Sequence, residues 1–511
     1  MHRRSDRGAL IGERLFMRGN ALFEPGRNCA TVALTQRHAV VIDAADYFRA
    51  ARDAMLRAEE QILLICWDFD PRIKLDPDAD DGDHPNRLGD FILWLARRRP
   101  QLQIHVLMWN IGAVKLLGRG RAVLTSLRWA RRRNITFKFD SAHPIGAAHH
   151  QKIVVIDDAL AFCGGIDMTA DRWDTSAHLD DDPRRRRPSG RCYGAWHDAT
   201  VALDSEAAKA LGEIGRDRWR RACGDALPVP SATGDDIWPE WLKPDFRDLP
   251  VAISRTRPNH EGEDGLREIE RLYLDMIASA RRFIYAENQY FASRKIAEAM
   301  AARLAEPDPP EIVLINPETA DGPLQEEAMG SARARLMEKL EQLDHRRRFR
   351  IYTPVTEAGD PIYVHAKIMI VDDVILRVGS SNMNNRSLGL DSECDVTIEA
   401  GATNATNRRT IAAIRTRLMA EHLGVEPEAI VRLITENGDS IIAVIEQVRG
   451  KGKTLVPFEP PPLNEIEKKL ADNEVLDPES PDEMFEPYAQ RGLFRRWSRH
   501  MRRPSFTRGR G

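Results

Sequence analysis

Two segments of the sequence repeat one arrangement of residues that can act on a phosphate ester. In each segment a histidine is followed by a lysine two positions later and by an aspartate five positions after that. The two sets are His150, Lys152 and Asp157, and His365, Lys367 and Asp372. Glycines follow both sets at matching positions, Gly164 and Gly379, and all the matches share one offset. A gap-free match of this kind indicates an internal duplication and not chance.

The spacing of the histidine and the lysine predicts that they act together. Successive side chains of a strand point to opposite faces, so residues two positions apart project to the same side. Apolar runs at 153–156 and 368–371 follow the lysines and predict buried, rigid strands. Two such segments facing each other would surround one small space with two imidazoles and two ammonium groups. That set suits a phosphodiester, so the sequence predicts a phosphodiesterase.

The residue types also predict a division of roles. Lys152 and Lys367 would neutralise the phosphoryl oxygens and the charge of a five-coordinate transition state. One histidine would attack phosphorus and form a phosphohistidine, while the other would donate a proton to the leaving alkoxide. These roles reverse when water or an alcohol resolves the intermediate. Because the lysines supply the charge that a cation would otherwise provide, we expect no metal site and no cofactor.

Several further residues are predicted to support this site. An imidazole nucleophile needs its second nitrogen held by a carboxylate or a carbonyl, and Asp198 and Glu393 occupy related places after the two motifs. Glycines at the turns after the motifs would let backbone approach a ligand closely. The supporting or phosphate-binding candidates are Gly165, Asp167, Asp198, Ser380, Asn382 and Glu393. Asp157 and Asp372 are grouped with the catalytic residues, although their place at the strand ends favours holding backbone or a neighbouring cation.

Alternating helix and strand patterns must position these residues. An amphipathic stripe through 47–55 leads into an apolar strand at 62–67, and a similar stripe through 266–280 leads into 283–288. Further strands at 104–108 and 312–315, and helices around 123–131 and 329–343, follow in the same order. This alternation predicts an α/β fold of two similar halves, each a mixed β-sheet flanked by helices, with the active site at their interface.

The domain organisation is predicted from the repeat and from changes in composition. We expect an N-terminal extension (1–35), a first half (36–226), a Pro-containing linker (227–249), a second half (250–435) and a C-terminal helix with an Arg-rich tail (436–511). The segment 491–511 holds eight arginines interleaved with aromatic residues. Its composition is typical of a disordered, solvated tail, and the alternative is an interfacial anchor for anionic lipid.

Composition and spacing argue against a strongly basic nucleic-acid-binding protein, a zinc-finger domain and a membrane-spanning protein. With 75 basic and 78 acidic residues the net charge is −3, which gives no overall field that attracts polyanions. The six cysteines form no C-x-x-C pair. No signal-peptide apolar region and no membrane-spanning window are found. We therefore expect a soluble protein, cytoplasmic or peripheral to a membrane, with secretion by a non-Sec route left open.

The motifs together resemble those of a known family. HHQKIVVID, FCGGIDMTADRWD (162–174) and WHD (196–198) are similar to the first-half signature of the phospholipase D superfamily. ENQYF (287–291) and the segment from His365 onward are similar to its second-half signature, and the resemblance, to the phospholipid-cleaving branch, covers roughly 35–435. It implies the phospholipase D fold, with sheets packed side by side, and metal-independent catalysis with His150 as nucleophile and His365 as general acid. Asp167 replaces the expected asparagine, so the two half-sites should differ.

The resemblance implies a phospholipase D that hydrolyses the headgroup phosphodiester of glycerophospholipids to phosphatidate, with some transfer to alcohols. A cardiolipin synthase-type phosphatidyltransferase, a superfamily nuclease and a non-enzymatic lipid-binding descendant are the alternatives. The expected partner is a phospholipid membrane surface, met peripherally. No nucleic acid and no obligate protein partner are expected.

Overall fold

The computed structural model describes residues 22–110, 121–231, 236–319, 329–401, 404–460 and 477–478. The Arg-rich tail lies outside these residues. In the first half the strands are β1 (Thr31–Ile42), β2 (Gln61–Cys66), β3 (Gln103–Trp109), β4 (Ile135–Asp140), β5 (Ile153–Ile156), β6 (Leu160–Gly164), β7 (Trp196–His197) and β8 (Ala199–Asp204). The helices of this half are α2 (Ala44–Met55), α3 (Leu88–Arg98), α5 (Arg121–Ala130) and α6 (Ser205–Cys223).

The second half repeats this order and then extends it. Its strands are β9 (Phe246–Arg257), β10 (Leu266–Arg267), β11 (Phe283–Glu287), β12 (Glu311–Ile315), β13 (Phe349–Val355), β14 (Tyr363–Val364), β15 (Ile368–Val371), β16 (Ile375–Gly379), β17 (Glu393–Glu399) and β18 (Thr454–Pro457). Its helices are α7 (Glu268–Ser279), α8 (Arg294–Leu304), α10 (Ser331–Leu343), the π-helix η2 (Arg386–Leu390), α11 (Ala405–Leu423), α12 (Pro427–Glu436) and α13 (Ile441–Val448).

The named strands of both halves, except β7 and β14, are joined in one mixed sheet. From the centre outward the first half runs β1-β8-β6-β5-β2-β3-β4, and the second half runs β9-β17-β16-β15-β11-β12-β13. The two orders correspond strand for strand, as expected from a duplicated chain. The halves meet where β1 pairs antiparallel with β9, in a register from Thr31↔Ile253 to His38↔Phe246. The predicted pair of similar α/β halves is confirmed, and their sheets are joined edge to edge.

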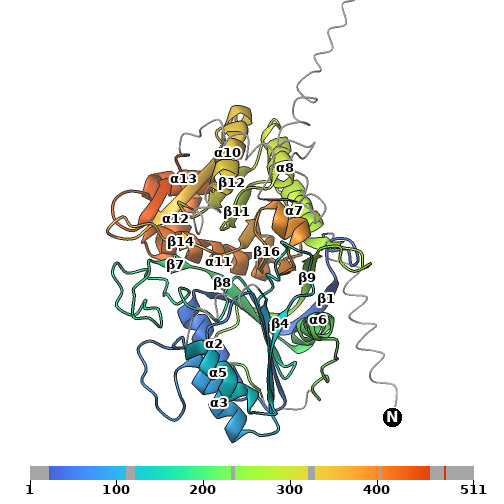
Figure 1. Cartoon of the computed structure of the whole chain (residues 1–511). Helices are drawn as coiled ribbons and strands as arrows, with labels where there is room; N and C mark the ends of the chain where they lie inside the picture. The colour runs from blue at the N-terminus through green and yellow to red at the C-terminus, as the bar shows by residue number, and fades with distance from the viewer. Residues whose placement is uncertain are drawn as a thin grey trace, which may run out of the picture.

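Helices cover both faces of this sheet. In Figure 1 α2, α3 and α5 gather on one outer side of the first half, and α7, α8 and α10 gather on that of the second. The stripes that predicted α2 and α7 face the core: Tyr47 belongs to one core cluster with Ile62 and Ile104, and Tyr273 belongs to another with Ile284. These helices form because their apolar residues recur at three- and four-residue spacing and so share one buried face.

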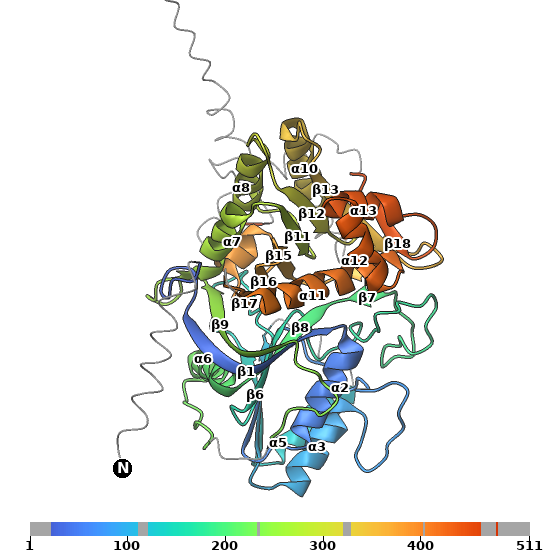
Figure 2. The ribbon, with the colours of Figure 1, turned by 180° about the vertical axis from the view of Figure 1, so that it is seen from behind.

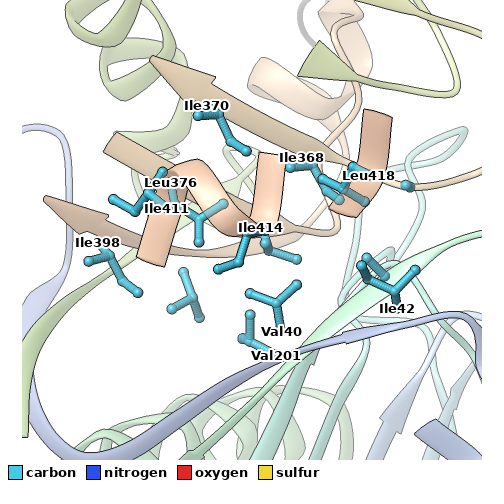
Figure 3. Packing of buried hydrophobic residues seen from close by; sticks show 14 of the residues in the cluster. Val40, Ile42, Val201, Ile368, Ile370, Leu376, Ile398, Ile411, Ile414 and Leu418 are labelled. Atoms are coloured by element: carbon cyan, nitrogen blue, oxygen red, sulfur yellow. The ribbon is translucent and has the colours of Figure 1, made fainter. Parts of the chain in front are cut away.

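The inner faces of the two halves share a single core around α6 and α11. Seen from behind, α11 runs between the halves, above β8 (Figure 2). Figure 3 shows Ile411, Ile414 and Leu418 of α11 placed between strand residues of the second half and Val40 and Val201 of the first. Because this helix buries apolar side chains against both halves, it contributes to fixing their relative position.

Three strands extend beyond the residue ranges expected for the two halves. Strand β9 begins at Phe246, inside the stretch predicted as a linker, and β1 begins at Thr31, inside the predicted N-terminal extension. Strand β18 returns from the predicted C-terminal region and pairs antiparallel with β13. The strands at the junction carry charged residues, and β9 contains Pro250, so neither shows the clear alternation that marks a strand in a sequence.

Within the described part of the chain, no helix combines the length and the apolar character needed to cross a bilayer.

Candidate active site

The two motif histidines lie at the junction of the halves, and each is held by a carboxylate of the other half. His150 Nδ1 lies 2.9 Å and 3.0 Å from the two carboxylate oxygens of Glu393. His365 Nδ1 lies 2.7 Å from Asp198 Oδ2. A carboxylate accepts the Nδ1 proton, so each ring presents the lone pair or proton of Nε2 to the site. Asp198 and Glu393 therefore lie where the sequence predicted histidine-orienting groups, in a crossed arrangement.

Backbone pairing across the junction produces this crossed arrangement. The His150 amide donates to the Ser392 carbonyl at 2.9 Å, one residue before Glu393. The His365 amide donates to the His197 carbonyl at 2.7 Å, one residue before Asp198. The short strands β14 and β7 continue the second of these contacts as a parallel pair. Each histidine is thus placed by main-chain bonds to the partner half and then oriented by the next side chain there.

The two motif lysines are buried beside the histidines. Lys152 Nζ donates to the His150 carbonyl at 2.9 Å and lies 3.3 Å from Asp167 Oδ2. Lys367 Nζ donates to the His365 carbonyl and lies 3.4 Å from Gln289 Oε1. Each ammonium thus donates to the backbone carbonyl of the histidine in its own motif. The site therefore contains two buried lysines, one from each half.

The two half-sites are not copies of each other. Asp167 forms an ion pair with Lys152 and accepts the Trp67 amide at 3.0 Å. Its counterpart Asn382 instead donates to Gln289 Oε1 at 3.3 Å, the same oxygen that faces Lys367. Lys152 faces the negative charge of Asp167, whereas Lys367 faces the neutral amide of Gln289. Lys367 therefore has less negative charge beside it than Lys152 has. The asymmetry predicted from the exchange of asparagine for aspartate is thus present in the contacts.

Glu393 is fixed by two hydroxyl groups. Ser380 Oγ donates to one carboxylate oxygen at 2.5 Å, and Ser387 Oγ of η2 donates to the other at 2.7 Å. Burial raises the pKa of Glu393 to about 7, and nearby Lys152 opposes the rise. Ser380 was a predicted supporting residue, whereas Ser387 has no counterpart in the repeat and was missed.

Burial also shifts the other titratable groups of the site. It lowers the pKa of Lys367 to about 7, with Asp198 opposing the change. Burial and then the neighbouring lysines lower the pKa of His150 well below its usual range, and burial followed by Lys367 does the same for His365. Burial raises the pKa of Asp198. An anionic ligand would raise the pKa of the two histidines, because a nearby negative charge favours their protonated form. The protonation of these histidines can therefore change when substrate binds.

Gly165 makes room for the carboxylate of Asp198. A Cβ atom at this position would lie 2.1 Å from Asp198 Oδ1, far inside van der Waals contact. The predicted role of this turn was to bring backbone near a ligand. In the structure the missing side chain instead leaves space for the group that orients His365.

We expect Gly165→Ala to lower kcat by about 100-fold or more, because displacing Asp198 moves His365 from its aligned position. Gly194→Ala is the matched control, since a Cβ there meets nothing within 4 Å. Steady-state kinetics of both variants, with thermal unfolding to verify folding, would check this. Equal activity of the two variants would contradict the role given to Gly165.

Comparisons with known proteins found a family model and relatives that are similar to this chain. The model of the family described as "Cardiolipin synthase, PLD-like domain" matches residues 273–414. Phospholipase D A of Dictyostelium discoideum is 23% identical, over 76% of this chain and 35% of the relative. Phospholipase D alpha 4 of Arabidopsis thaliana is 22% identical, over 79% of this chain and 68% of the relative. The chain therefore spans about a third of the first relative's length and about two thirds of the second's.

A solved structure agrees with the fold. The phosphatidylserine synthase of Haemophilus influenzae Rd KW20 aligns with a TM-score of 0.50 and 13% identity, over 82% of this chain and 98% of that one. Nearly the whole of that chain is thus matched by both halves and their junction. The family model and the named relatives support assignment of the chain to the phospholipase D superfamily. The twin motifs and the crossed histidine–carboxylate pairs are the features of the chain that bear on chemistry.

Aromatic residues that were not named as site candidates from the sequence lie beside the two histidines. The Trp196 ring stacks on Tyr363 with centroids 4.6 Å apart and lies 5.2 Å from the His365 ring. The Arg172 guanidinium lies 4.2 Å above the same indole. Trp67 lies edge-on to the His150 ring at 6.0 Å. Arg172 and Trp196 lie in the segments FCGGIDMTADRWD and WHD, which are similar to the first-half signature of the family. Their contacts with the candidate catalytic residues were not predicted.

The two aspartates that close the motifs, grouped above with the catalytic residues, hold backbone amides, as their place at the strand ends favoured. Asp157 accepts the backbone amides of residues 59, 60 and 61 at 2.6–2.9 Å. Asp372 accepts those of residues 281, 282 and 283 at 2.6–2.8 Å. Each stands five residues beyond its lysine, about 17 Å along a strand. The motif spacing reflects a structural need, because these carboxylates fix the start of the neighbouring strands β2 and β11.

The aspartates that follow them bind helix arginines. Asp158 pairs with both terminal nitrogens of Arg216 on α6 at 2.8 Å. Asp373 pairs with Arg415 on α11 at 2.8 Å and 2.9 Å. Each Asp-Asp turn therefore joins a motif strand to the helix that covers the inner face. These ion pairs fix the ends of β5 and β15, and this helps to hold the histidines that precede the same strands.

We expect Asp372→Ala to lower the free energy of unfolding by about 1–2 kcal/mol, because three backbone amides lose their acceptor. We expect kcat to stay within about threefold of wild type, since the carboxylate is remote from the histidines. Urea unfolding and steady-state kinetics would measure both. Asp439→Ala, at another aspartate of positive φ (66°), controls for the backbone change. A loss of activity with unchanged stability would restore a catalytic role.

Proposed function

We propose that this protein is a phospholipase D that hydrolyses the headgroup phosphodiester of glycerophospholipids to phosphatidate, with transfer to alcohols as a side reaction. The observation that carries the proposal is the pair of crossed contacts, His150 with Glu393 and His365 with Asp198, around two buried lysines. Two oriented imidazoles of this kind can supply a nucleophile and a general acid to one phosphorus atom. The lysines meet the charge that develops on the phosphoryl oxygens.

In the first step His150 Nε2 attacks phosphorus while Glu393 holds the proton on Nδ1. The bond from phosphorus to the headgroup oxygen breaks, and that oxygen takes the proton from His365 Nε2, while Asp198 holds the proton on Nδ1 of the same ring. The headgroup alcohol leaves, and the phosphatidyl group remains on His150. Lys152, Lys367 and the amide of Asn382 surround the phosphoryl oxygens during this displacement.

In the second step the roles of the histidines reverse. His365, now without its proton, accepts one from a water molecule as the water oxygen attacks phosphorus. The bond from His150 Nε2 to phosphorus breaks, phosphatidate is released, and the original protonation state is restored. An alcohol in place of water gives a transferred phosphatidyl group by the same path.

The choice of a phospholipid substrate is supported by the relatives rather than by the site geometry. Two relatives that align with about three quarters of the chain are named phospholipase D. The test is mass spectrometry of lipids after the full chain is incubated with vesicles of phosphatidylcholine and phosphatidylethanolamine. We expect phosphatidate to appear with wild type and to be absent with His150→Ala. The lipase proposal would be refuted if wild type released no more phosphatidate than His150→Ala does.

A phosphatidyltransferase is the second candidate, because the matching family model is described by cardiolipin synthase. With phosphatidylglycerol as the sole lipid, a transferase would yield cardiolipin and glycerol, whereas a lipase would yield phosphatidate and glycerol. The same chemistry on nucleic acid would appear as plasmid nicking in the presence of EDTA. Product identity therefore separates the three activities.

The pKa values of the site predict a narrow bell-shaped pH profile. As the pH falls below about 7, Glu393 gains a proton and no longer accepts from His150 Nδ1, so the rate falls. As the pH rises above about 7, Lys367 loses its proton and its hold on the phosphoryl oxygens, so the rate falls again. We expect kcat/KM to peak near neutrality. A flat profile between about pH 5 and about pH 9 would contradict these assignments.

A further inference from the structure

Next to the active site, four buried side chains that have no role in the proposed reaction lie close together. They come from both halves and are Asp43, His178, His197 and Glu421. Asp43 stands between β1 and α2, His197 lies on β7, and Glu421 lies on α11. Their side chains are exposed by 4% or less. One ligand atom from each lies within 4.8 Å of all the others.

The distances within this cluster match the edges of a metal coordination shell. His197 Nδ1 lies 2.9 Å from Glu421 Oε1 and 3.3 Å from Asp43 Oδ1. His178 Nε2 lies 3.1 Å from Glu421 Oε1 and 3.9 Å from Asp43 Oδ2. In a tetrahedral zinc site with bonds of about 2.0–2.1 Å, neighbouring ligand atoms stand about 3.3–3.4 Å apart. The four distances in the cluster, from 2.9 Å to 3.9 Å, include this value.

Hydrogen bonds alone leave one of these atoms unsatisfied. His197 Nδ1 is buried and has no partner in hydrogen-bonding geometry within the described residues, although two carboxylates lie nearby. A buried polar atom without a partner costs free energy. A cation between the imidazole and the carboxylates would satisfy it, because a metal bond uses the nitrogen lone pair directed into the cluster.

The other nitrogen of each histidine is held as metal-binding histidines are. His178 Nδ1 lies 3.0 Å from Asp174 Oδ2, and His197 Nε2 lies 2.7 Å from Glu287 Oε2. A metal-ligating histidine almost always donates its remaining N–H to a carboxylate, which fixes the ring and its tautomer. These outer carboxylates are fixed in turn: Asp174 accepts the Trp196 amide at 2.8 Å, and Glu287 accepts the Tyr285 hydroxyl at 2.6 Å.

The position of Asp43 also favours a ligand role. It is the N-cap residue of α2, yet its carboxylate makes no cap hydrogen bond and its backbone has φ 64° and ψ 154°. That region is essentially restricted to glycine and costs roughly 1–3 kcal/mol for other residues. The strained backbone directs the carboxylate towards His197 instead of the helix.

We propose that Asp43, His178, His197 and Glu421 bind one Zn²⁺ as a closed structural site that joins the two halves. Two nitrogens and two carboxylate oxygens suit this ion, and four buried protein ligands leave no open position for substrate. The metal takes no part in the phosphoryl transfer. It positions His197, whose carbonyl accepts the His365 amide, and through the next residue it positions Asp198. The inference is independent of which phosphodiester the enzyme cleaves.

The first test is the metal content of the full chain, expressed in zinc-supplemented medium and measured by inductively coupled plasma mass spectrometry. We expect about one zinc per chain in wild type and at least a tenfold lower content in Asp43→Asn and His178→Gln. Asp46→Asn, an exposed aspartate on the same helix, should keep the full content. Wild type with less than about a tenth of an equivalent, or equal zinc in all the variants, would overturn the proposal.

A second measurement does not depend on the variants folding. Wild type stripped with a chelator should unfold at a lower temperature and recover on addition of zinc. Added Co²⁺ should give the visible absorption of a four-coordinate ion with nitrogen and oxygen ligands. Stripped protein that takes up no cobalt, or an absorption typical of six-coordinate cobalt, would overturn the proposal even if the enzyme hydrolyses phospholipid.

Discussion

His365→Asn should convert the enzyme into a trap that stops with the phosphatidyl group on His150. With a p-nitrophenyl phosphatidyl ester, the leaving group needs no proton, so the first step proceeds without the general acid. The second step needs His365 to take a proton from water, so it should slow by about 10²–10⁴-fold. We expect a burst of one equivalent of p-nitrophenolate, followed by very slow turnover, and a covalent adduct in the intact mass.

The matched control for this experiment is His150→Ala, which should give neither burst nor adduct. Peptide mapping of the trapped protein would locate the phosphoryl group. An adduct on a different residue, or a burst from His150→Ala, would contradict the assignment of His150 as nucleophile. With an ordinary headgroup as leaving group, both variants should be nearly inactive, because the alkoxide then requires protonation.

Glu393→Gln should abolish most of the activity although it leaves both motifs untouched. A glutamine amide can donate to Nδ1 of His150, which moves the ring proton to Nε2 and removes the lone pair that attacks phosphorus. The analogous loss of an orienting carboxylate in a catalytic triad costs about 10⁴-fold in kcat, so we expect about 10³-fold or more. Stopped-flow measurement of the burst should show that intermediate formation has slowed.

Glu399→Gln is the matched control for that variant, because Glu399 ends the same strand β17 and is the same type of residue. It should retain wild-type kinetics. If Glu393→Gln kept activity within about tenfold of wild type, Glu393 would be a structural carboxylate and His150 would not depend on it.

The repeat made much of the fold predictable. The two-residue spacing of histidine and lysine, followed by runs such as 153–156, predicted which side chains point together, because strand periodicity does not depend on context. The stripe through 266–280 predicted α7 for the same kind of reason. The joining strands β1 and β9 were harder to find, since charged residues and Pro250 obscure their alternation. Local pattern is informative where one face is buried and weak where a strand lies at a junction.

The sequence indicated which residues form the site, but not which of them contact one another. Sequence order suggested Asp198 and Glu393 as orienting carboxylates, yet it carries no information on which half faces which. The crossed pairs depend on backbone bonds between residues more than 150 positions apart, such as that from the His365 amide to the His197 carbonyl. Asp372 was grouped with the catalytic residues because a motif gives the spacing of a residue and not its contacts, although its place at the strand end favoured the backbone contacts that the structure shows.

The crossed pairs have a consequence for how the site behaves on dilution. Each half of the chain supplies the carboxylate that orients the histidine of the other half. Reciprocal contacts of this kind are typical of the interface of a symmetric dimer, and here both halves belong to one polypeptide. A covalent tether replaces a bimolecular encounter by an effective concentration of about millimolar order. The specific activity of this enzyme should therefore be independent of protein concentration, and chains cut between α6 and β9 should lose activity on dilution as their two fragments separate.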